Sequence, residues 1–183
     1  ACRQPRPPPA DIARDEPGLH FDREDLCLDI HQDLFRLDRV PSRALALSDR
    51  MDTVWNRLVP CAFQGSQIAR LDPIDEFIIL GWHALKHSFS HLKWLVDLKL
   101  MYQNLSGCPD FHRRLRTLPD DSIRTGVWYA LRLLNEWLRV PVSPTLIHAL
   151  SPGKTSWVEH RAFNLLRAGA EVEYFAELCF LRT

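Results

Sequence analysis

The stretch that decides the fold is Asp72–Leu105, which reads DPIDEFIILGWHALKHSFSHLKWLVDLKLMYQNL. Asp72 is a favourable N-cap residue, Pro73 suits the first helical position, and the acidic residues that follow suit the positive end of a helix dipole. The apolar residues then recur with the period of an amphipathic helix. We therefore predict a long helix that starts at Asp72, breaks near the SFSH sequence and ends near Leu105.

The residues on either side of this stretch predict a small β element and more helices. LHFDR and LCLDIHQ, at 19–23 and 26–32, alternate as strands do, and VPCAF and QIARL flank Gly65 as a second hairpin would. Helical patterns occupy residues 48–58, 109–118, 121–140, 143–150, 156–168 and 171–181. The predicted fold class is α+β, mainly α, with a small β hairpin element at the N-terminal side followed by a helical bundle.

Composition divides the chain further and excludes several classes of function. Residues 1–17 are rich in proline and charge and form a lead-in, residues 18–71 contain the β element, and residues 72–183 form the helical domain. Lys plus Arg and Asp plus Glu both number 23, so no nucleic-acid surface is indicated, and no apolar run suits a membrane span. The five scattered cysteines fit a reducing compartment, and we expect a cytoplasmic protein.

Several histidines in the deciding stretch raise the question of a site. On one continuous helix, the side chains of His83, His87, Trp94 and Asp97 would lie on one face. Three interpretations stay open: a structural polar network, contact with a ligand, and a zinc site in which Asp97 or His91 completes the i, i+4 histidine pair. Lys86, at the edge of this face, is either a solvated lysine or a phosphate contact.

Two segments carry a resemblance to a known family. LCLDIHQDLF, from residue 26, and the run from Gly65 to Leu105 are similar in order and spacing to the later half of uncharacterised bacterial nucleotidyltransferase-like proteins. These proteins resemble the polymerase-β-type nucleotidyltransferase superfamily. The similarity covers roughly residues 25–106 and, more loosely, the helical remainder.

The resemblance implies a nucleotidyltransferase-like domain, of which residues 18–71 would be a remnant, followed by a helical domain. Its chemistry is nucleotidyl transfer from a nucleoside triphosphate to an acceptor, with Mg²⁺ held by carboxylates on adjacent strands. Asp29 stands at the position of a third catalytic, metal-binding carboxylate, and His31 and Lys86 stand at ligand-binding positions. Gln32 replaces the usual aromatic residue. The family positions assigned to a structural polar network are His83, His87, Trp94 and Asp97.

The Gly-Ser turn and Asp-x-Asp strand that open the family pattern are not found at the expected place in this chain. We therefore expect the chain to be the carboxyl-terminal part of a nucleotidyltransferase-like protein, inactive by itself and completed by an N-terminal segment or a partner protein. A non-catalytic helical interaction module is the alternative, and a zinc-dependent hydrolase ranks third.

Overall fold

The computed structural model describes residues 18–23, 26–31, 53–118, 122–153 and 155–169, together with residues 172, 175 and 179. The chain divides into two compact units, residues 1–41 and residues 42–183. The predicted lead-in and residues 48–52 of the helix predicted at 48–58 lie outside the described residues. Of the remaining residues of that predicted helix, 53–55 are helical and 56–58 are not. The predicted domain boundary after Leu71 stays a prediction.

The first unit contains an antiparallel hairpin of β1 (Gly18–Arg23) and β2 (Leu26–His31). Its register pairs Gly18 with His31 and Arg23 with Leu26. The turn predicted at the Glu-Asp dipeptide between the strands lies outside the described residues. The structure describes only the backbone here. The placement of the Asp29 and His31 side chains on one side of β2 therefore stays a prediction.

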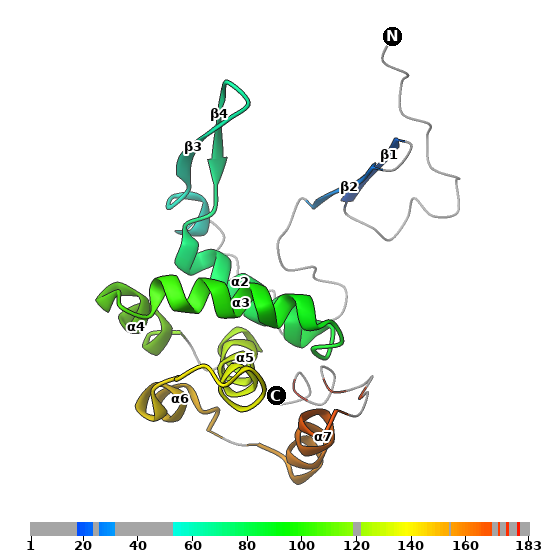
Figure 1. The fold of residues 1–183 in the computed structure, drawn as a ribbon, viewed down its shortest axis with the longest axis vertical. Helices are drawn as coiled ribbons and strands as arrows, with labels where there is room; N and C mark the ends of the chain where they lie inside the picture. The colour runs from blue at the N-terminus through cyan, green and yellow to red at the C-terminus, as the bar shows by residue number, and fades with distance from the viewer. Residues whose placement is uncertain are drawn as a thin grey trace. The chain divides into compact units, whose positions relative to one another are not determined.

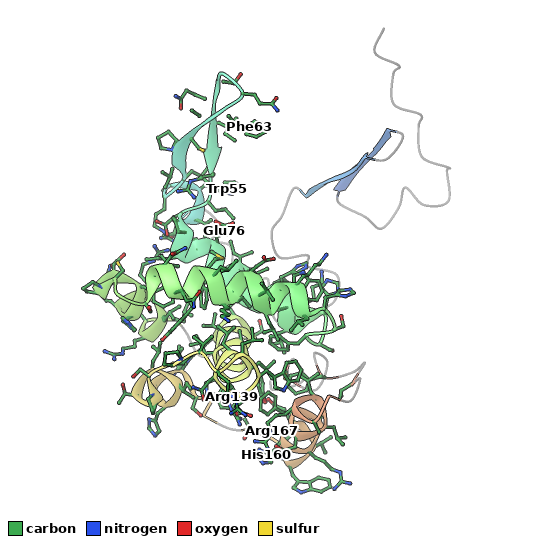
Figure 2. All side chains as sticks on the ribbon, in the orientation of Figure 1. Trp55, Phe63, Glu76, Arg139, His160 and Arg167 are labelled. Carbon is green, nitrogen blue, oxygen red and sulfur yellow. The ribbon has the colours of Figure 1, made fainter. Side chains whose placement is uncertain are left out.

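After the helical residues 53–55, the second unit forms a tight hairpin of β3 (Val59–Phe63) and β4 (Ser66–Arg70) (Figure 1). The two turn residues, Gln64 and Gly65, have φ angles of 48° and 79°. Positive φ at both positions is typical of the two-residue turn that matches the strand twist, and glycine adopts it without steric cost. Most of the hairpin is exposed, including Phe63 next to the turn (Figure 2).

The deciding stretch forms two helices instead of one, with the break where the sequence predicts it. α2 (Pro73–Lys86) starts at Asp72, whose side chain accepts hydrogen bonds from the backbone N–H groups of Ile74 and Asp75 at 3.0 and 3.3 Å. α3 (Leu92–Leu105) follows a short turn and lies in front of α2 in Figure 1. The N-cap and proline positions are confirmed.

The remaining helices agree with the predicted ones. They are α4 (Pro109–Arg116), α5 (Ser122–Leu138), α6 (Pro144–Leu150) and α7 (Trp157–Arg167). Phe175 and Cys179 of the helix predicted at 171–181 are helical, and most of that helix lies outside the described residues. The fold class is confirmed as α+β, mainly α.

The core forms around α5, which contacts α2, α3, α6 and α7 (Figure 1). Ten of its residues are buried, which leaves little of the helix to solvent. Against α2 the backbones come so close that Gly126 of α5 meets Gly81 and Trp82 with no room for a side chain. None of the helices in the described part of the chain combines the length and apolarity needed to cross a bilayer.

Candidate functional site

Three histidine rings surround the indole of Trp94 where α2 ends and α3 begins. The centroids of the His83 and His87 rings lie 5.1 Å from the Trp94 centroid, and that of the His91 ring lies 4.9 Å from it. The rings of His83 and His87 are 4.7 Å apart. We call these four residues the histidine–tryptophan cluster.

The turn between the helices creates this cluster. Ser88 and Phe89 have φ angles of 52° and 53°, which place two non-glycine residues in the left-handed region. Such residues persist only when the surrounding structure holds them, and here Phe89 is buried and its backbone N–H donates to the Ala84 carbonyl at 2.7 Å. The chain reverses in a few residues, and the first turn of α3 brings Trp94 against the last turn of α2.

The histidine–tryptophan cluster is accessible to solvent. His87 and His91 are exposed, whereas His83 and Trp94 are half-buried. Lys86 lies in the same last turn of α2, with its ammonium nitrogen 5.8 Å from the Trp82 ring centroid. The negative end of the helix dipole favours cationic side chains at this end of α2. Such side chains also place N–H donors at the surface, from which phosphate oxygens accept hydrogen bonds.

The structure brings some of the predicted site residues together and not others. His83, His87 and Trp94 meet at the α2–α3 turn. On a continuous helix they would share a face, but Trp94 would lie about 10 Å from His87 and about 16 Å from His83 along the axis. Asp97 is exposed on α3, and in the described part of the chain it forms no hydrogen bond with the histidines. Asp29 and His31 belong to the other unit. The functional roles of all these residues stay predictions.

A network of carboxylates and guanidinium groups lies at the opposite end of α2. Asp75, whose side chain is 4% exposed, accepts hydrogen bonds from Arg57 at 2.7 Å and from Arg114 of α4. Arg114 also donates to Asp72 at 2.7 Å. This network ties the segment before β3 and helix α4 to the start of α2. The sequence does not predict this network, because the local pattern indicates only capping and dipole roles for Asp72 and the acidic residues that follow it.

The pKa values in this network follow from its contacts. Burial by itself would raise the pKa of Asp72, but hydrogen bonds from Arg114 and from the backbone N–H groups of Asp75 and Ile74 leave it below its ordinary value of 3.8. The hydrogen bond to Asp75 raises the pKa of Arg57, although burial opposes this. Both ions are therefore favoured in the charged form.

A second buried polar group lies between α5 and α7. The Tyr129 hydroxyl donates to the fully buried carboxylate of Glu159 at 2.5 Å, and the Cys179 thiol lies 3.5 Å from the same oxygen. Burial raises the pKa of the Cys179 thiol far above its ordinary value. The thiol is therefore protonated, and the group holds the last described residues onto the bundle.

The family of the chain follows from a match over most of its length. A family model described as an uncharacterised nucleotidyltransferase matches residues 7–139. The chain belongs to this uncharacterised nucleotidyltransferase family. No curated protein and no solved structure matches the sequence significantly.

The nucleotidyltransferase match covers both hairpins, the α2–α3 turn, α4 and α5. The histidine–tryptophan cluster and the network at the start of α2 therefore both belong to the family segment. Helices α6 and α7, and with them Glu159, follow it. The expected resemblance is confirmed at the level of the family, and its bacterial origin and superfamily placement stay predictions.

The described residues do not by themselves fit a metal ion. Among them, no group of three His, Cys, Asp or Glu side chains could hold one. His83 and His87 are adjacent, but no third ligand joins them within the part of the chain that the structure describes. A zinc site with three protein ligands is therefore not found among the described side chains.

Proposed function

We propose that this chain is the carboxyl-terminal part of a nucleotidyltransferase-like protein and that the histidine–tryptophan cluster, with Lys86, faces a nucleoside triphosphate. The observation that carries the proposal is the accessible cluster of imidazoles and a lysine at the α2–α3 turn, inside the segment matched by the family. In this proposal the acceptor of the nucleotidyl group is left open.

The proposal gives a role to Lys86 and to the residues of the histidine–tryptophan cluster. The ammonium of Lys86 contacts phosphate, where a flexible point charge suits oxygen atoms spread over several positions. His83 and His87 pack against Trp94 and hold the α2–α3 turn in shape. On the family resemblance alone, His31 of β2 is proposed separately as a ligand-binding residue. The protein would act mainly by positioning the triphosphate and neutralising its charge.

Mg²⁺ is the metal proposed for the reaction, on the family resemblance alone. Asp29 is proposed as one carboxylate of its site. Because a single carboxylate does not hold the metal ions of a triphosphate, the remaining ligands would come from outside the described residues, and we propose that this chain alone is inactive. We place the protein in the cytoplasm, which the free thiols of Cys61, Cys108 and Cys179 support.

The role of Lys86 can be tested in the full-length gene product. Calorimetric titration with each nucleoside triphosphate and Mg²⁺ would compare wild type, Lys86→Ala and the matched control Lys99→Ala, which removes a lysine from the middle of α3. A lost charge-assisted phosphate contact should weaken binding by about tenfold in Lys86→Ala and leave Lys99→Ala near wild type. Equal affinities in all three proteins would refute the assignment.

A non-catalytic helical interaction module is the second candidate function. The exposed apolar side chains of α7 favour it: Trp157 is 72% exposed and Val158 and Leu165 are each 49% exposed. Under this alternative, the full-length gene product would bind no nucleoside triphosphate and would associate stably with another protein. Saturable nucleotide binding in the titration above would exclude it as the whole function.

A further inference from the structure

An apolar stripe runs along the solvent side of α3. Leu92, Val96 and Leu100 follow one another at intervals of four residues and are 58%, 41% and 54% exposed. Residues at this spacing lie on one face of a helix. The buried residues of α3, Leu95 and Leu98 among them, face the opposite way, toward the core. The stripe therefore lies on the exposed face of α3.

Two opposite charges flank this stripe on the same side. At about 100° per residue, Lys93 and Asp97 both lie beside the line through Leu92, Val96 and Leu100, separated by one helical turn. Neither forms an ion pair with any residue that the structure describes, and the ammonium of Lys93 lies 5.9 Å from the Trp94 ring centroid. Both charges are exposed. The face thus presents a cation and an anion at a fixed separation.

We propose that the apolar stripe of α3 binds the same stripe of a second copy of this chain, with the two helices antiparallel about a two-fold axis. In an antiparallel pair, the same side of each helix faces its counterpart, and positions exchange about the axis. With the axis near Leu95, the level of Lys93 on one copy coincides with the level of Asp97 on the other. The two-fold symmetry repeats this pair. Two Lys93–Asp97 ion pairs, each joining the two copies, therefore lie beside the paired apolar stripes.

The size of the stripe sets the expected strength of the contact. Leu92 to Leu100 spans about 12 Å along the helix axis, at about 1.5 Å per residue. Such a seam is short, and an interface centred on it falls at the lower end of the sizes that specific complexes bury. The dimer is therefore expected to be in concentration-dependent exchange with the monomer, with a dissociation constant in about the micromolar range.

Sedimentation equilibrium of the chain over a range of concentrations tests the apolar seam. Val96→Asp places a charge at the centre of each copy's stripe and should weaken dimerisation at least about tenfold. Ile68→Asp, at an apolar residue of β4 that is 43% exposed, is the matched control and should leave dimerisation unchanged. A monomeric wild type at hundreds of micromolar protein, or equal dimerisation of both variants, would overturn the proposal.

A charge-exchange experiment tests the antiparallel arrangement. Lys93→Glu leaves only acidic groups at the paired positions and Asp97→Lys leaves only basic ones, so each variant alone should dimerise more weakly than wild type. An equimolar mixture should recover dimers, because each acidic pair of positions then meets a basic pair. The antiparallel arrangement would be refuted if only Asp97→Lys weakened dimerisation, or if mixing the two variants did not restore dimers. None of these readouts involves a nucleotide, so failure of the proposed function would leave them unaffected.

Discussion

The close contact of α5 with α2 at Gly126 gives the sharpest stability prediction. Gly126 of α5 lies against α2 so tightly that a Cβ atom added to it would be 2.7 Å from the Cα atom of Trp82 and 3.0 Å from the carbonyl oxygen of Gly81. These are backbone atoms, which cannot turn aside as the end of a flexible side chain can. Gly126→Ala must therefore push α5 away from α2 or distort one of the helices.

The cost can be estimated from two opposing effects. Overpacking of a well-packed core costs about 1–3 kcal/mol and occasionally more, and a clash with backbone belongs at the upper end. Replacing a helical glycine with alanine returns about 1 kcal/mol through helix propensity. We expect Gly126→Ala to lower the free energy of unfolding by about 2 kcal/mol or more.

The facing glycine provides a matched control. A Cβ atom at Gly81 would lie 3.4 Å from the Cα atom of Val127 and 3.5 Å from its Cγ2 atom, which is ordinary contact. Gly81→Ala keeps the helix propensity gain of about 1 kcal/mol without the clash, and should be neutral or stabilising. Urea unfolding followed by circular dichroism would measure both variants. If Gly126→Ala were as stable as Gly81→Ala, the close approach of α2 and α5 would be wrong.

Two further predictions concern the network at the start of α2. Asp75→Asn removes the buried charge that Arg57 and Arg114 share, and should lower the free energy of unfolding in urea by about 3 kcal/mol. The control Asp110→Asn, in the exposed pair with Arg113, should lower it by less than about 1 kcal/mol. Because the pKa of Asp72 is lowered in the folded state, the stability it contributes is fully present above its ordinary pKa of 3.8 and is lost as the pH falls through the lowered value. Thermal unfolding of wild type and Asp72→Asn should therefore differ at pH 6 and converge toward pH 2, and a constant difference would contradict this.

Local signals made most of the fold predictable. The Asp72 cap and Pro73 fix the start of α2, and the Gln64-Gly65 turn fixes the second hairpin, because each depends on a few neighbouring residues. The position of the break between α2 and α3 was predicted from the SFSH sequence. What the sequence could not predict was that Ser88 and Phe89 take left-handed conformations, since neither residue favours them.

The turn explains how far the candidate site could be predicted. A continuous helix aligns His83, His87, Trp94 and Asp97, whereas the observed turn restarts the helix and joins Trp94, but not Asp97, to the histidines. The network of Asp72 and Asp75 could not be found, because Arg114 lies 42 and 39 residues further along the chain. Nothing in a local pattern identifies such a partner, and only the packing of α4 against α2 brings it there.

The measurement that tests the proposed nucleotide site most directly is an NMR titration of the full-length gene product, ¹⁵N-labelled at its tryptophans, with a nucleoside triphosphate and Mg²⁺. The Trp94 indole signal, identified by its loss in Trp94→Phe, should shift and saturate with nucleotide, while that of Trp157, 72% exposed on α7, should stay in place. Nucleotide binding that leaves the Trp94 signal unmoved, or no binding at all, would contradict the proposal that the histidine–tryptophan cluster faces the nucleotide.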